Sequence, residues 1–211
     1  IIVIDSPEAE KNIKKYIGKK KIIRISRNTL FDSVVQEIKD VEIIKNNNLI
    51  VTIHRTENIY NKKLLNKFIN LLIEIENKNL FDEIIWYCHD ITFNALIKNS
   101  YNNLLIQKGI KLKKLLTHNK FILELCKSKS IITDGGSIAE ECSILGLKTI
   151  IWRDLVENIQ YLNKNVILSN YDSTYIFEFL NMNNLNTEIT KFDDINLVSP
   201  SKEFVEELIN L

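Results

Sequence analysis

Residues 134–141 read Asp-Gly-Gly-Ser-Ile-Ala-Glu-Glu and combine backbone donors with carboxylates. The apolar stretch before them is typical of a strand, and the stretch that follows is typical of a helix. Gly135, Gly136 and Ser137 would form the turn where this helix begins, so that backbone N–H groups and the positive end of the helix dipole face a ligand. The pattern indicates an anion site of the kind that holds a pyrophosphate, while paired glycines can also make a tight turn that binds nothing.

Two adjacent glutamates follow in the same predicted helix. Neighbouring helix positions point in different directions, so one of Glu140 and Glu141 can reach a ligand while the other is solvated. A carboxylate is a poor ligand for phosphate but a good acceptor for two ribose hydroxyls. Together with the glycine turn, this pair of residues indicates a nucleotide diphosphate.

A second group of side chains that could take part in catalysis or binding lies at the end of the apolar run 47–54. It consists of His54, Arg55, Thr56, Glu57 and Asn58 in succession. Ligands of parallel α/β sheets bind at the carboxyl ends of the strands, which is where this group lies. His54 is therefore a candidate catalytic residue, with a hydrogen-bonded structural histidine as the alternative. Glu57 and Asn58 can instead serve only to cap the next helix.

The other histidines of the chain, His89 and His118, also follow predicted strands. Because the carboxyl ends of parallel strands meet at one edge of a sheet, we expect all three histidines in a common cleft.

Whole-chain composition narrows the class of protein. The 211 residues are 45% hydrophobic and 26% charged, a composition that fits a well-buried core. The formal net charge is +1, so the sequence lacks the excess of basic residues that is typical of proteins that bind nucleic acid or an acidic membrane. No apolar run reaches the length of a spanning helix, and no signal peptide is recognisable. Cys88, Cys126 and Cys142 lack a Cys-x-x-Cys spacing, which favours free thiols in the cytoplasm over a zinc site.

Short β-branched runs alternate with segments of helical periodicity along the whole chain. The expected strands are residues 20–26, 47–54, 82–89, 110–116, 130–134, 148–152 and 165–169. The expected helices are residues 28–44, 61–79, 92–100, 119–129, 137–146 and 199–211. This alternation predicts a Rossmann-like parallel sheet with helices on both faces, as a single domain over 1–211. The chain opens without methionine on Ile-Ile-Val-Ile-Asp, so we expect it to be a piece of a longer protein.

Three motifs in order resemble a known family. Residues 51–65 (VTIHRTENIYNKKLL), 131–154 (IITDGGSIAEECSILGLKTIIWRD) and 157–169 (ENIQYLNKNVILS) resemble the second half of the non-hydrolysing UDP-N-acetylglucosamine 2-epimerases. Residues 5–35 also resemble the segment that leads from the first domain of these enzymes into the second. The resemblance spans nearly the whole chain.

The resemblance implies one half of a two-domain glycosyltransferase-B-type fold, with an N-terminal domain of the same protein as partner and a homodimer as candidate assembly. It implies a UDP-sugar substrate, elimination and re-addition of UDP at C2, and neither a metal nor a redox cofactor. Gly135, Gly136 and Ser137 would hold the diphosphate and Glu141 the ribose. His54 would stabilise the departing UDP, and Arg55 and His89 would also contact the substrate.

The sequence departs from the family pattern at several positions. Arg27 replaces a glycine before Asn28, and the turn around His89 lacks its prolines. His118 replaces an aromatic residue near the uracil but can still stack on a base. Val156-Glu157-Asn158 replaces Thr-Glu-Arg, which removes a guanidinium expected to bind phosphate or sugar.

Two other functions fit the same motifs. The donor domain of a glycosyltransferase would share the fold, the phosphate-binding turn and the ribose glutamate, but gives no reason for the His54 group. A non-catalytic homologue that binds UDP-sugar would explain the departures from the pattern.

Overall fold

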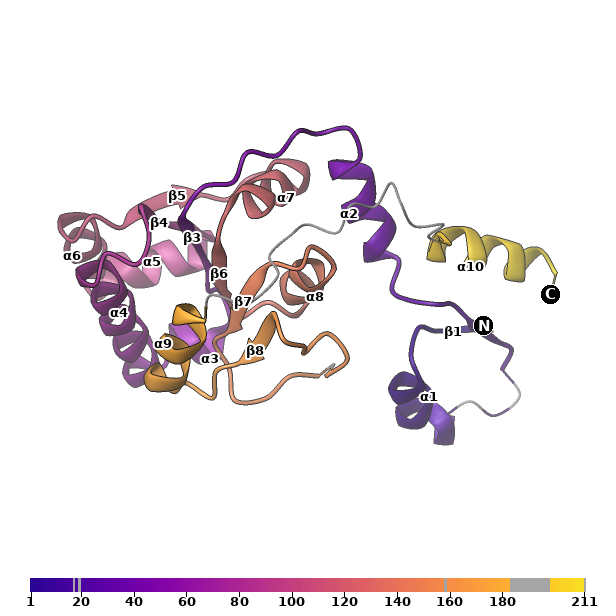
Figure 1. Ribbon diagram of the computed structural model, residues 1–211. Coiled ribbons are helices and arrows are strands. Elements are labelled where there is room, and N and C mark those ends of the chain that lie inside the picture. Colours follow the sequence, from indigo (N-terminus) through magenta and orange to yellow (C-terminus); the bar gives the residue numbers. More distant parts are fainter. Residues whose placement is uncertain (17, 19, 158, 183–197, 211) are drawn as a thin grey trace. The chain divides into compact units, whose positions relative to one another are not determined.

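The computed structural model describes residues 1–16, 18, 20–157, 159–182 and 198–210. The chain separates into two compact units, the first formed by Ile1–Val41 with Lys191–Leu211 and the second by Glu42–Thr190 (Figure 1). The Rossmann-like part of the prediction corresponds to the second unit. One domain over 1–211 stays a prediction.

The second unit is built on a six-stranded sheet with the order β5-β4-β3-β6-β7-β8. All neighbouring strands in it pair parallel. The strands are β3 (Asn48–Thr52), β4 (Glu83–Cys88), β5 (Lys111–Lys114), β6 (Ser130–Thr133), β7 (Lys148–Ile151) and β8 (Val166–Leu168). The order runs outward from β3 in one direction and from β6 in the other, so the switch point of the topology lies between these two strands.

Helices cover both faces of this sheet, because its central strands are apolar on both sides. Leu49 and Val51 pack into the large core cluster, while Ile50 between them is equally buried on the opposite face. Figure 1 shows α4, α5, α6 and α9 on one side of the sheet and α7 and α8 on the other. The helices of this unit are α3 (Thr56–Ile59), α4 (Lys62–Asn77), α5 (Asp90–Lys98), α6 (Tyr101–Gln107), α7 (His118–Lys127), α8 (Gly136–Ile144) and α9 (Ser173–Asn181).

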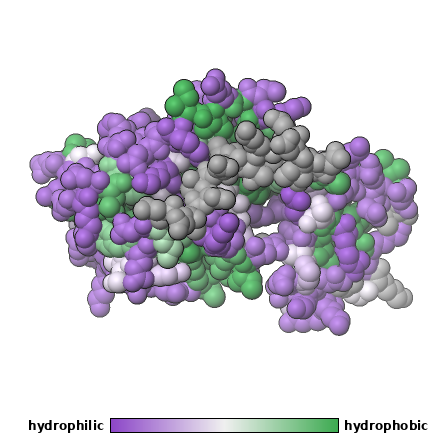
Figure 2. Space-filling model, viewed as in Figure 1, coloured by the Kyte–Doolittle hydropathy of each residue, from purple (hydrophilic) through white to green (hydrophobic). Residues whose placement is uncertain are grey.

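Aromatic rings fill the core between α4 and the sheet. The Phe68 ring lies 5.3 Å from Trp86 and 5.0 Å from Trp152, measured between centroids. Trp152 in turn meets Tyr171 edge-on at 5.2 Å. Figure 2 shows hydrophilic residues over most of the visible surface of α4 and α6, as expected for helices that bury a single apolar stripe.

The first unit holds a two-stranded parallel sheet and helices from both ends of the chain. Strand β1 (Ile2–Ile4) pairs with β2 (Ile22–Arg24). The remaining elements are α1 (Pro7–Ile13), η1 (Lys14–Tyr16), α2 (Leu30–Ile38) and α10 (Pro200–Ile209). Asp32 of α2 accepts hydrogen bonds from the Ser199 hydroxyl and the Ser201 N–H, at 2.9 and 2.8 Å, and so holds the start of α10.

Each predicted strand is present, although the one expected at 20–26 is β2 and belongs to the first unit. The helix predicted over 28–44 is wrong at its end, because α2 stops at Ile38 and the asparagine-rich stretch beyond it leads into β3. Helix α9 was not predicted, since its aromatic and β-branched residues are weak helix formers. Asp172 nevertheless starts it by accepting hydrogen bonds from the Thr174 and Tyr175 N–H groups.

We expect Phe68→Ala to lower the free energy of unfolding by about 3–5 kcal/mol, because it leaves a cavity between two buried indoles. Phe93→Ala is the matched control: Phe93 lies on α5 with 41% of its surface exposed, so its loss should cost under about 1 kcal/mol. Urea denaturation of the whole chain measures both. Equal losses would contradict the packing described.

Candidate functional site

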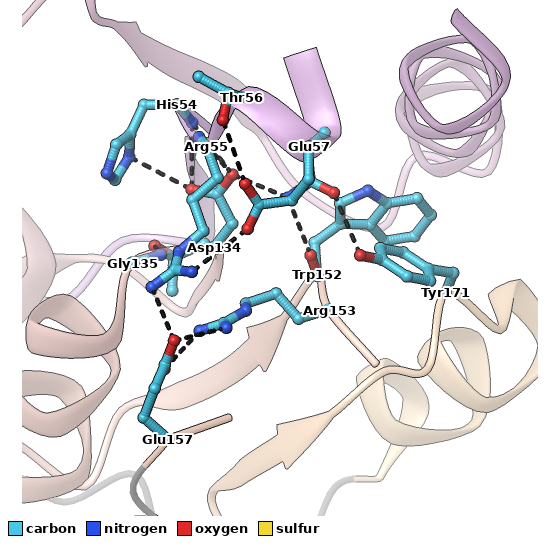
Figure 3. A network of polar contacts seen from close by, with 12 residues as sticks. His54, Arg55, Thr56, Glu57, Asp134, Gly135, Trp152, Arg153, Glu157 and Tyr171 are labelled. Carbon is cyan, nitrogen blue, oxygen red and sulfur yellow. Dashed lines mark hydrogen bonds and ion pairs between the residues drawn. The ribbon is translucent and has the colours of Figure 1, made fainter. Parts of the chain in front are cut away.

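Asp134 joins the ends of the two strands at the switch point. It follows β6 directly and is fully buried. Its carboxylate accepts the backbone N–H of His54 at 3.1 Å, the backbone N–H of Arg55 at 2.9 Å and the Asn58 side-chain amide at 2.9 Å. We call these residues, His54, Arg55, Asn58 and Asp134, the Asp134 cluster, and Figure 3 labels His54, Arg55 and Asp134. The cluster fixes the loop after β3 against the loop after β6.

The imidazole of His54 is held by the same carboxylate. Nδ1 lies 3.2 Å from Asp134 Oδ1, while 44% of the side chain remains exposed. A Cβ atom on Gly135 would stand 3.3 Å from His54 Cε1, which is tighter than ordinary contact. The glycine at position 135 therefore leaves room for the histidine ring. Because Nδ1 faces Asp134, Nε2 is the ring nitrogen that can serve a ligand.

Asn58 is a buried connector rather than a helix cap. Its amide group also donates to the Trp152 carbonyl at 3.2 Å, and its oxygen accepts from the Tyr171 hydroxyl at 3.3 Å. The capping role considered for Asn58 is wrong, because Asn61 caps α4 by accepting from the Lys63 and Leu64 N–H groups. Asn58 thus links the aromatic core to the Asp134 cluster.

A cavity of about 400 Å³ opens beside the cluster, at the carboxyl ends of the strands. His54, His89 and His118 all line it, which confirms the common cleft expected for the three histidines. Its apolar walls include Ile53, Leu116, Phe121 and Ile138. An apolar slot with a few polar groups is the usual form of a small-molecule site.

Glu141 and His118 face each other across this cavity wall. Glu141 is buried, and its Oε1 lies 2.8 Å from His118 Nε2. The contact orients the carboxylate, and the imidazole has 46% of its side-chain surface exposed. Glu141 thus lines the cavity, while Glu140 is not among the lining residues.

His89 lines the cavity but also has a structural task. It is the N-cap residue of α5, and its Nδ1 accepts a long hydrogen bond of 3.5 Å from the Ile91 N–H. The ring is therefore turned partly toward its own backbone.

The start of α8 forms another side of the site. Gly135 is the N-cap residue and offers no side chain to the first-turn N–H groups, which have no acceptor within a helix. The Gly135 N–H itself donates to Thr133 Oγ1 at 3.0 Å, so the donors for an anion begin at Gly136. Ser137 lines the cavity directly.

Arg55 lies outside the cavity lining and pairs with carboxylates instead. Its guanidinium stands between two carboxylates, 3.2 Å from Glu57 and 3.3 Å from Glu157 (Figure 3). Glu157 also binds the Arg153 guanidinium through two hydrogen bonds of 2.8 Å. Hydrogen bonds from Arg153 are the main cause that lowers the pKa of Glu157 to about 2.

Three of the departures from the family pattern fall in different settings. Val156, next to the retained Glu157, is buried in the core, and Asn158 lies outside the residues that the structure describes. Arg27 belongs to the first unit, where its guanidinium stacks 4.4 Å from the centre of the Phe31 ring.

Sequence reasoning assigned no role to Asp134 and only a capping role to Asn58, although both are central to the site. The available signal was a carboxylate directly after the short strand Ser-Ile-Ile-Thr, where burial is expected and a charge needs several donors. Within the described residues, no group of three or more His, Cys, Asp or Glu side chains could hold a metal ion. None of the described helices has the length and apolar character that crossing a membrane requires.

We expect Asp134→Asn to lower the free energy of unfolding by about 2–4 kcal/mol, because an amide NH₂ would face N–H donors in a buried place. Asp154→Asn, a change at an exposed carboxylate, should stay within about 0.5 kcal/mol. Thermal and urea unfolding measure both variants. An unaltered stability of the Asp134 variant would contradict the role of the cluster.

Comparison with known proteins identifies relatives of this chain. The family model described as UDP-N-acetylglucosamine 2-epimerase matches residues 6–191. The UDP-N-acetylglucosamine 2-epimerase of Methanocaldococcus jannaschii is 28% identical over 144 residues, which cover 62% of this chain and 39% of that protein. The enzyme of the same name from Methanococcus maripaludis is 29% identical over 170 residues, covering 72% and 45%. The chain thus spans less than half the length of these relatives.

Solved structures show the same fold. The UDP-GlcNAc 2-epimerase of M. jannaschii superposes with a TM-score of 0.78 at 22% identity, over 99% of this chain and 62% of the other. The UDP-GlcNAc 2-epimerase of Neisseria meningitidis, bound to UDP-GlcNAc, gives 0.69 at 18% identity, over 99% and 61%. The predicted α/β fold class, half of a glycosyltransferase-B-type architecture, is confirmed. With most of its length matched by the family model, the chain belongs to the UDP-N-acetylglucosamine 2-epimerase family.

Proposed function

We propose that the second unit is the UDP-binding part of an enzyme that interconverts UDP-GlcNAc and UDP-ManNAc by eliminating and re-adding UDP. One observation carries the proposal: the cavity at the switch point is apolar and combines His54, Glu141 and Ser137 of the α8 start in its lining. A base and a ribose need apolar walls with one acceptor, and a diphosphate needs a helix N-terminus. Membership of the family supports the same substrate class.

The nucleoside would occupy the apolar part of the cavity. A volume of about 400 Å³ suits a uracil and a ribose. The Glu141 carboxylate, oriented by His118, would accept hydrogen bonds from the ribose hydroxyls. The exposed face of the His118 ring would stack on the base, as one aromatic surface does on another.

The diphosphate would bind where α8 begins. The Gly136 and Ser137 N–H groups and the helix dipole favour negative charge there. His54 would present Nε2 to the departing UDP while Asp134 holds Nδ1. A hydrogen-bond donor that is already in position stabilises the transition state, in which negative charge grows on the departing UDP, more than it stabilises the ground state. His89 would add a contact from the cavity wall, and Arg55 one from outside it.

The remaining chemistry belongs, in this proposal, to parts of the protein outside this chain. Carboxylates of the partner N-terminal domain would move the C2 proton, and neither metal nor redox cofactor is required. The product would serve cell-surface polysaccharide or capsule synthesis. We also propose a cytoplasmic location and a homodimeric full-length enzyme. Cys88, Cys126 and Cys142 are buried free thiols, which suits a reducing compartment.

The function is tested by incubating the full-length protein with UDP-N-acetylglucosamine in deuterated water and following the C2 proton by NMR. Exchange at C2 supports the epimerase. Transfer of the sugar to an acceptor with release of UDP would support a glycosyltransferase, and UDP-sugar binding without turnover would support a non-catalytic homologue.

We expect Glu141→Ala to weaken UDP binding by about 1–3 kcal/mol, because it removes a charged acceptor from the ribose hydroxyls. Glu140→Ala is the matched control on the neighbouring position and should cost little. Isothermal titration calorimetry with UDP measures both. A larger loss from Glu140 would show that the assignment within the pair is reversed.

In the full-length enzyme, His54→Ala should lower kcat by roughly 10²-fold or more and change UDP affinity far less, since one donor to a developing charge is lost. His118→Ala should mainly weaken nucleotide binding, because stacking on uracil is equal in ground and transition states. Steady-state kinetics and UDP titration separate the two effects. An unchanged kcat in folded His54→Ala enzyme would remove the catalytic role, and unfolding would favour a structural histidine.

A further inference from the structure

Glu157 occupies a place where an anion is strongly favoured. Its Oε1 atom lies 2.8 Å from Arg153 Nη2 and 3.3 Å from Arg55 Nη2, and its Oε2 atom lies 2.8 Å from Arg153 Nη1. Figure 3 shows the carboxylate between the two guanidinium groups. A carboxylate that receives a two-point contact from one arginine and a third contact from another reproduces the way arginines hold phosphate oxygens.

This anion position lies in the same neighbourhood as the start of α8. The Tyr161 hydroxyl stands 3.7 Å from the place of a Cβ on Gly136. Burial is the main cause that raises the pKa of Tyr161, with Glu157 raising it further and Arg153 and Arg55 lowering it. Those three charged groups therefore act electrostatically on a hydroxyl that adjoins the α8 N-terminus. Arg55 is also the residue after His54, and Asp134 holds its backbone.

The Glu157 side chain can move out of the contact with Arg55 and Arg153 more easily than either arginine can. The Arg153 side chain is 9% exposed and the Arg55 side chain 30%, whereas Glu157 is 64% exposed. The carboxylate is already largely hydrated, so it can turn away from the arginines into water, while Arg153 stays in the protein. Its low pKa means that Glu157 is ionised at neutral pH and neutralises the pair of arginines.

We propose that Glu157 is an internal competitor, whose carboxylate occupies the place of a phosphate group between Arg55 and Arg153 until the diphosphate of a nucleotide displaces it. The inference rests on the proposed function, because it takes the phosphates of UDP as the displacing anion. Glu157 thereby lowers the affinity for phosphorylated ligands and leaves the affinity for the nucleoside part unchanged.

The test is Glu157→Gln, which keeps the size of the side chain and removes its charge. UDP should bind this variant of the 211-residue chain about three- to tenfold more tightly than the wild type, the range expected when one partly exposed ion pair no longer competes. Uridine, which has no phosphate, should bind both proteins equally. Glu74→Gln, at a carboxylate paired with Lys78 on α4, is the charge-matched control and should leave UDP affinity unchanged.

A second measurement separates competition from a structural role. Arg55→Gln should cost more UDP affinity in the Glu157→Gln background than in the wild type, because Arg55 is then free of one competing carboxylate. Glu157→Gln that binds UDP no more tightly than wild type, or that tightens uridine equally, overturns the inference. If the competitor role fails in this way but the wild-type chain binds UDP in the same titration, the proposed function still holds. If none of the proteins tested binds UDP, both the competitor role and the proposed function are wrong.

Discussion

A buried carboxylate must receive enough hydrogen bonds to offset the loss of water, and the site depends on how Asp134 meets that demand. Its partners are the backbone N–H groups of His54 and Arg55 and the Asn58 amide, all from the segment after β3. The demand is met only when the ends of β3 and β6 are in register. One charge therefore aligns the histidine, the glycine turn and the start of α8.

The sheet was predictable because a strand that is buried on both faces has consecutive apolar residues rather than alternating ones. Residues 48–52 and 130–133 are examples. The gathering of His54, His89 and His118 was predictable for a related reason, since parallel strands end at one edge. The same logic brought Ser137 and Glu141 to the cavity. Strand-end position in the sequence was thus sufficient to find the three histidines and Ser137, whereas the choice of Glu141 over Glu140 came from the family resemblance.

Contacts between individual side chains could not be predicted from the positions of the strand ends. The sequence places Arg55 next to His54, but its guanidinium turns away toward Glu157, which lies 102 residues further along the chain. Asn58 resembles a helix cap until its amide is seen to join Asp134 and Trp152. Such choices follow from competition among many nearby partners in three dimensions. The early end of α2 and the division of the chain into two units likewise depend on packing that local patterns do not record.

The pairing of β3 with β6 also has a consequence for how the chain acquires its site. His54 and Asp134 are 80 residues apart, and β4, β5 and their helices lie between them along the chain. Contacts of such long range form slowly, since closing the intervening loop costs entropy before any contact repays it. A nascent chain that has emerged only as far as α7 has the histidine but not the carboxylate that orients it. The proposed nucleotide site would therefore be complete only late in folding, and a bound nucleotide would stabilise only chains that have completed the central pairing.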